Sequence, residues 1–161
     1  NSKTIKKVDL DTFFYPLDNI KNWNKFYGDE GFVQYQFIIP EDVSLKGIDE
    51  ILNLISDSGR APFLGVLKFF GESNENYLSF PMKGYSLAVD FKYDESLLKF
   101  LDEIDKIVLK FNGRIYLTKD SRLSKGAFDT GYPLANKFRE FRKKHGLDKK
   151  FQSSQSNRLE I

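Results

Sequence analysis

Six polar residues, spaced along strand-like segments, are the groups in this sequence best suited to hold a ligand. They are Gln34 and Gln36 (segment 32–39), Lys68 (63–70), Ser86 and Asp90 (85–91), and Tyr116 (114–117). Together they offer amide, ammonium, hydroxyl, carboxylate and phenol groups, which donate and accept many hydrogen bonds. Such a set suits a polyhydroxylated ligand.

The alternation of apolar and polar residues predicts that this set shares one face of a sheet. The opposite, apolar set comprises Val33, Tyr35, Phe37, Ile39, Tyr85, Leu87, Val89, Phe91, Ile115 and Leu117. A solvated polar face is the ordinary alternative for an antiparallel sheet. Glutamine is a poor strand former, however, and two of them in one central strand favour a binding role.

The elements that must position these residues follow the order β-α-β-β-α-β. Apolar residues at helical spacing predict helices over 46–58 and from Leu97 to Phe111, between the strands named above. This is the split βαβ arrangement of ferredoxin-like folds. We therefore expect an α+β fold, an antiparallel sheet with helices on one face. Extra helices are expected between Asp18 and Gly28, and around Leu134, Phe138 and Phe141 up to Gly146.

Composition limits the classes of function. The 161 residues suit a single domain, 1–161, and 25 basic against 23 acidic residues give no field that would attract nucleic acid. The chain has no cysteine, no metal-binding or cofactor fingerprint, no apolar run of membrane-spanning length and no signal peptide. We expect a cytoplasmic protein without a metal. The missing initiator methionine suggests a cut through a longer protein.

Several motifs resemble the FAD-linked oxidases of the vanillyl-alcohol-oxidase type, among them the decaprenylphosphoryl-ribose and aldonolactone oxidases. In chain order the motifs are 14–18 (Phe-Tyr-Pro-Leu-Asp), Trp23-Asn24, Tyr27-Gly28, 31–37, 66–68 with Gly71, 78–81 (Leu-Ser-Phe-Pro), Gly84-Tyr85, 89–91, 113–122 (Gly-Arg-Ile-Tyr-Leu-Thr-Lys-Asp-Ser-Arg), Phe151, Ser153 and Arg158-Leu159. The stretch 116–122 is the most specific. The resemblance covers almost the whole chain in the correct order.

The resemblance implies that this chain is the substrate-binding cap domain of a larger flavoenzyme, and that an N-terminal FAD-binding domain is absent from it. FAD would then be the cofactor, and a hydroxyl of a sugar, sugar-lipid or aldonolactone would be oxidised by hydride transfer, for example in making cell-envelope polysaccharide. Lys119 and Tyr116 would be catalytic. Gln34, Gln36, Lys68, Ser86, Asp90 and Tyr15 would bind substrate. The isolated fragment is expected to be inactive.

The resemblance also implies partners and leaves the sugar open. A short-chain reductase is the implied protein partner, and any membrane attachment would come through a lipid-linked substrate. The best-known family members have Asn and Cys where this chain has Ser86 and Ala88, so the identity of the sugar does not carry over.

Two readings without catalysis stay open. The run 31–37 echoes the aromatic signature of RNA-recognition domains, but there the aromatic side chains must face open for bases to stack. Alternation here places Tyr35 and Phe37 with the core, and the run falls on the first strand. A ligand-sensing module on the same fold is the other reading, because fold alone does not decide function.

Overall fold

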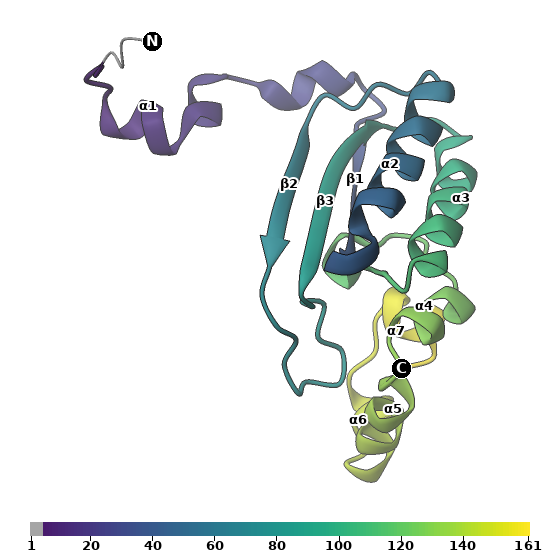
Figure 1. Cartoon of the computed structure of the whole chain (residues 1–161). Coiled ribbons are helices and arrows are strands. Elements are labelled where there is room, and N and C mark those ends of the chain that lie inside the picture. Colours follow the sequence, from purple (N-terminus) through teal and green to yellow (C-terminus); the bar gives the residue numbers. More distant parts are fainter. Residues whose placement is uncertain (1–4) are drawn as a thin grey trace.

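A four-stranded antiparallel sheet is the framework of the computed structural model, which describes residues 5–161 (Figure 1). Its strands are β1 (Phe32–Pro40), β2 (Gly65–Phe70), β3 (Gly84–Lys92) and β4 (Arg114–Ile115), in the spatial order β2-β3-β1-β4. The first and third strands are central neighbours, as the sequence predicts. The α+β, ferredoxin-like fold is therefore confirmed.

Two long helices cover one face of this sheet (Figure 1). They are α2 (Glu41–Asp57) and α3 (Leu97–Lys110). Phe37 and Ile39 from β1 pack with Ile51 from α2 and with Leu101 and Ile104 from α3, all almost fully buried. The apolar face assigned by alternation is thus the core, except that Tyr85, expected inside, is 37% exposed near the free β2 edge.

Helix α2 begins five residues before its predicted start at Lys46. Pro40 precedes the helix, and Glu41 and Asp42 occupy its first turn. Proline suits the entry to a helix, and carboxylates stabilise the unpaired N–H groups there. The periodic apolar residues alone do not reveal this polar first turn. Strand β2, in contrast, begins at Gly65, two residues after its predicted start at residue 63.

The single helix expected between Asp18 and Gly28 is wrong. The chain forms a short helix α1 (Leu10–Phe14), capped by Asp9, and then two separate 3-10 turns, η1 (Pro16–Asn19) and η2 (Trp23–Tyr27). Asn22 lies between the turns with φ 57°, a left-handed conformation that interrupts a helix. This N-terminal segment leads away from the sheet, and α1 stands apart from the body of the molecule (Figure 1).

The fourth strand is shorter than the predicted 114–117. It ends at Ile115, and the chain turns through η3 (Leu117–Lys119). Four helices follow: α4 (Lys125–Gly131), α5 (Ala135–Lys144), α6 (Leu147–Lys150) and α7 (Ser154–Leu159). Only α5 was predicted. None of the helices described for residues 5–161 combines the length and apolar character needed to cross a membrane.

Candidate functional site

The polar residues of β1 and β3 lie side by side on the sheet face that α2 and α3 leave uncovered. The strand register pairs Gln34 with Asp90 and Gln36 with Ala88, and it pairs Lys68 with Ser86 across β2 and β3. The grouping predicted from alternation is therefore present. Period-two geometry and antiparallel pairing suffice to explain it.

The first polar cluster centres on Asp90, which is 1% exposed. One carboxylate oxygen accepts a hydrogen bond from Gln34 Nε2 at 2.7 Å, and the other accepts one from the Tyr27 hydroxyl at 3.1 Å. Burial, together with the hydrogen bond to the Asp90 carboxylate, raises the pKa of Tyr27 to about 12. Tyr27 therefore remains a neutral donor throughout the physiological range.

The second polar cluster lies further along the same strands. Gln36 Nε2 donates to Ser86 Oγ at 3.0 Å, and both residues are buried. The loop between β2 and β3 folds over this end of the sheet, where the ring of Phe80 packs 4.5 Å from that of Tyr116. Tyr116 is consequently half-buried, and a loop closes this end of the polar face.

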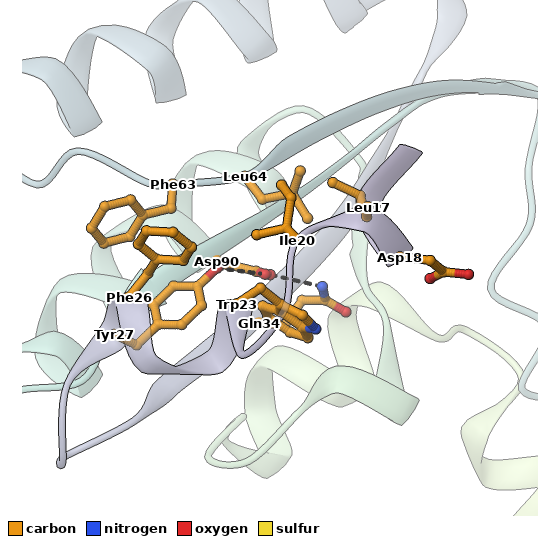
Figure 2. Close-up of a pocket in the computed structure, with 10 residues that line it drawn as sticks. All are labelled: Leu17, Asp18, Ile20, Trp23, Phe26, Tyr27, Gln34, Phe63, Leu64 and Asp90. Carbon is orange, nitrogen blue, oxygen red and sulfur yellow. Dashed lines mark hydrogen bonds between the residues drawn. The ribbon is translucent and has the colours of Figure 1, made fainter. Parts of the chain in front are cut away.

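A cavity of about 700 Å³ opens beside the first cluster. Its lining is mostly apolar and comes from the N-terminal segment, the approach to β2, and one polar residue each of β1 and β3: Leu17, Asp18, Ile20, Trp23, Phe26, Tyr27, Gln34, Phe63, Leu64 and Asp90. Figure 2 shows the hydrogen-bonded Tyr27, Asp90 and Gln34 surrounded by these apolar side chains. Apolar walls with a few fixed polar groups are typical of small-molecule sites, and this volume lies in their usual range.

The turn that carries Lys119 is fixed from both sides. The Tyr116 backbone N–H donates to Gln36 O at 2.8 Å, which joins the start of the turn to β1. At its end, the buried Asp120 carboxylate accepts from the backbone N–H groups of Arg122 and Leu123. Arg158 donates to the same carboxylate at 2.9 Å from α7. Burial opposes the ionisation of Asp120, but these hydrogen bonds prevail and lower its pKa.

The end of the 113–122 motif reaches the helix layer. Arg122 donates to Asp105 at 2.7 Å, and Asp105 also accepts from the Tyr35 hydroxyl at 2.6 Å. Burial raises the pKa of Asp105, although the Arg122 charge and hydrogen bond oppose this. The hydrogen bonds of Asp120 and Arg122 thus hold the specific motif in place, and Lys119 itself stays exposed.

Apart from Lys119, the predicted site residues fall into four positions. Gln34 and Asp90 border the cavity, and Gln36, Ser86 and Tyr116 lie under the loop further along the face. Lys68 is exposed on the edge strand, next to Ser86. Tyr15 is 58% exposed at the end of α1, outside the cavity lining.

Sequence reasoning missed the contribution of the N-terminal segment. Tyr27 and Trp23 enter the site from η2, where Trp23 packs edge-on against Tyr27 and Phe32 and is still 45% exposed. The run of exposed aromatic residues before β1 was the available signal.

The described residues show neither a cluster of metal ligands nor open rings of Tyr35 and Phe37. In the part of the chain that the structure describes, no three His, Asp or Glu residues gather closely enough to hold a metal ion. Tyr35 and Phe37 are 4% and 0% exposed against the helices. These two rings therefore cannot stack on nucleic-acid bases.

The chain is similar in sequence to two proteins with curated descriptions. The chain is 38% identical over 159 residues to decaprenylphosphoryl-beta-D-ribose oxidase of Mycolicibacterium smegmatis. The aligned region covers 97% of this chain and 34% of that protein. It is 34% identical over 134 residues to an uncharacterized protein in the mprA 5' region of Streptomyces coelicolor, covering 81% of this chain and 35% of that protein. No family model matches the chain.

The chain thus spans about a third of the length of these curated relatives. The similarity confirms the resemblance inferred from the motifs and agrees with the C-terminal position that they imply. Over nearly its whole length, this chain is similar in sequence to one portion, about a third, of a decaprenylphosphoryl-beta-D-ribose oxidase.

Proposed function

We propose that this chain is the substrate-binding portion of a flavin-dependent oxidase that oxidises a hydroxyl group of a sugar, a sugar-lipid or an aldonolactone. The rest of the enzyme, a domain that holds FAD, would be supplied by sequence outside this chain. The homology to an oxidase over 97% of the chain supports the class of reaction. The FAD cofactor and the sugar class are what the motif resemblance implies, and the polar groups of the site suit a hydroxylated ligand.

The observation that carries the proposal is the hydrogen-bonded floor of the cavity. Asp90, Gln34 and Tyr27 are held by mutual hydrogen bonds in buried or half-buried positions. A sheet face that served only to meet solvent would not need a buried carboxylate with its own phenol donor, because burying a charge is unfavourable unless it is paired. Asp90 and Gln34 retain acceptor and amide capacity that sugar hydroxyls can satisfy.

The N-terminal segment fits a covering FAD domain. Its exposed apolar side chains follow one another from α1 to the cavity: Leu10, Phe13, Phe14, Leu17, Ile20, Trp23 and Phe26, each between 43% and 66% exposed. An exposed apolar surface of this extent usually marks a contact with another domain or partner. The cavity walls formed by Trp23, Phe26 and Phe63 are also suited to pack against a planar ring. The residues present therefore fit an adjacent flavin.

The bound flavin would supply the acceptor for the hydride that leaves the substrate carbon. The residues of this chain would hold the sugar ring, exclude water and manage the proton of the reacting hydroxyl. Lys119 is the proposed group for that oxygen, with an ammonium that can donate to it and stabilise negative charge. The rigid anchoring of its turn by Asp120 and Tyr116 would keep this ammonium in a defined position. Tyr116 would orient the same oxygen.

The first experiment is spectroscopic. The full-length protein containing this chain is purified, and its visible absorption is followed anaerobically while aldonolactones and phosphoribosyl compounds are added. We expect a yellow protein that one sugar class bleaches. A colourless full-length protein would refute the FAD assignment, and a yellow protein that no sugar bleaches would refute the substrate class.

Lys119→Ala in the full-length protein tests the catalytic role. We expect turnover to fall by at least 100-fold, on the order expected for a group that assists proton transfer, with the flavin spectrum retained. Lys46→Ala is the control, because Lys46 is equally exposed but lies on α2, across the sheet from the cavity. Near-normal turnover of the Lys119 variant would refute this role.

A short-chain reductase that consumes the product is the partner we propose.

A further inference from the structure

The end of the molecule formed by α5 and α6 concentrates positive charge. Residues 135–151 contain seven Lys or Arg and two Asp or Glu, a net charge of +5, whereas the whole chain carries +2. The remaining residues therefore carry −3. A chain with almost balanced composition is thus strongly polarised, and its positive pole lies beyond the sheet and away from α1 (Figure 1).

The exposed side of α5 places a phenylalanine between two lysines. Lys137, Phe141 and Lys144 follow one another at i, i+4 and i+7, which puts them in one stripe along the helix. The opposite side, with Ala135 and Arg142, is buried. Phe141 is 43% exposed, with Tyr77, itself 40% exposed, nearby at a ring distance of 6.4 Å.

A second basic and aromatic group lies at the same end of the molecule, on α6 (Figure 1). Lys149, Lys150 and Phe151 lie at the end of α6, and Phe151 is 61% exposed. The buried guanidinium of Arg142 donates to Leu147 O at 3.0 Å and to Phe151 O. This bridge fixes both ends of α6 to the buried side of α5, so the two helices form one end of the molecule.

Lysines elsewhere in the described structure are of two kinds: some are paired, and others, such as Lys46, Lys68 and Lys99, form no ion pair but do not lie together in one cluster. Lys83, Lys106, Lys110 and Lys125 each form an ion pair with a carboxylate. Within residues 5–161, no ion pair is found for the five lysines 137, 143, 144, 149 and 150, which are all exposed. A helix face that only meets water usually mixes both signs of charge in mutual pairs. Unpaired lysines around exposed phenylalanines are instead available to an external anion.

We propose that the α5–α6 end, the surface formed by these five lysines with Tyr77, Phe141 and Phe151, docks the enzyme on an anionic lipid bilayer. Lysines attract the negative headgroups, and aromatic rings settle at the boundary of headgroups and acyl chains. The net negative charge of the remaining residues would be repelled and would orient the molecule with this end towards the bilayer. The bilayer contact would come from this chain itself, independently of any lipid attached to a substrate.

The test is co-flotation of the full-length protein with substrate-free vesicles. One set contains equal parts of phosphatidylcholine and phosphatidylglycerol, and the other contains phosphatidylcholine alone. We expect binding to the anionic vesicles that weakens as salt is added, and little binding to the neutral ones. Equal binding to both sets, or none to either, would overturn the proposal.

Charge-neutralising variants locate the contact. Replacing Lys137, Lys143 and Lys144 together by Gln should lower the vesicle partition coefficient about 100-fold, because each lysine near an anionic surface adds roughly a factor of 5 to 10. Phe151→Ser should also lower it, without a change in charge. The control replaces three exposed lysines of α2 and α3, namely Lys46, Lys99 and Lys106, by Gln, which changes the net charge equally.

The result must depend on position. Loss of binding in the control as large as in the α5 variant would mean that net charge alone is responsible, and the proposal would fail. It would also fail if single-stranded RNA bound this end more tightly than the anionic vesicles, since the basic end would then be a nucleic-acid site. Flavin absorbance and sugar oxidation are measured on the same variants, so a failure here is distinct from a failure of the proposed function.

Discussion

Replacing Asp120 with asparagine tests whether the Lys119 turn depends on a buried charge. The carboxylate is 3% exposed and accepts four hydrogen bonds, from two backbone N–H groups, from Gln155 and from Arg158. Asparagine keeps the size and one acceptor oxygen. The asparagine NH₂ group would replace one carboxylate oxygen and, as a donor, would face two other donors: either Gln155 and Arg158, or the two backbone N–H groups. At least two hydrogen bonds are therefore lost, and Arg158 loses its counter-charge.

The expected loss is about 3 kcal/mol of unfolding free energy at neutral pH. Breaking a buried ion pair by removing one partner typically destabilises by ~3–5 kcal/mol, and the lower end applies because Arg158 is 29% exposed and can be hydrated. Asp129→Asn is the matched control. Asp129 also pairs with an arginine, at 2.6 Å, but its carboxylate is 36% exposed, so its loss should be under ~1 kcal/mol.

The pH dependence gives a second check by urea unfolding. The folded-state pKa of Asp120 lies below its ordinary value, so its stabilisation is fully present above the unfolded pKa of about 3.9. It is lost as the pH falls through the lower folded pKa, so the difference between the wild type and Asp120→Asn should shrink there. A loss no larger than that of Asp129→Asn, or a difference independent of acid pH, would refute the reasoning.

Three further changes have defined outcomes. Tyr27→Phe removes the hydroxyl donor to Asp90 and should lower the free energy of unfolding by about 2 kcal/mol. Because the pKa of Tyr27 is raised from 10.0 to about 12, the greater stability of the wild type should disappear as the pH rises through that range, measured by urea unfolding at several pH values. Gly84→Ala would set a Cβ 2.1 Å from a backbone oxygen of β1 and should lose about 2 kcal/mol or more, whereas Gly126→Ala, in open space on α4, should gain about 0.5 kcal/mol by thermal unfolding. Phe37→Ala empties a fully buried position and should lose about 3–5 kcal/mol, measured by urea unfolding, and a loss under about 1 kcal/mol would contradict the core assignment.

The central strands could be predicted because their pattern is local. Alternation along β1 and β3, with antiparallel pairing, is enough to bring Gln34 beside Asp90 and to separate both from Phe37 and Val89. The strength of the polar cluster could not be predicted in the same way. It depends on Tyr27, which reaches Asp90 from 63 positions earlier in the chain, out of a 3-10 turn without a periodic pattern.

The turn around Lys119 and the last helix show a second limit. Alternation through 114–117 predicts a strand, but the backbone bonds from Lys119 N to Tyr116 O and from Asp120 N to Leu117 O turn the chain into η3, and the Asp120 carboxylate then fixes the two residues after the next one. Helix α7 has few apolar residues and is set by a reciprocal cap between Ser153 and Ser156. These hydrogen bonds join residues two or three positions apart, but the periodicity of apolar residues does not reveal them.

The bond from Arg158 to Asp120 joins residues 38 positions apart, and it has a consequence for the timing of synthesis. A ribosome releases the sheet and both covering helices well before α7, so the framework can form on a nascent chain while the Lys119 turn still lacks one of its anchors. The Lys119 turn would then gain its last anchor only after residue 158 has emerged. A chain stalled shortly before that point would have a folded core, but its Lys119 turn would lack the bond from Arg158 to Asp120.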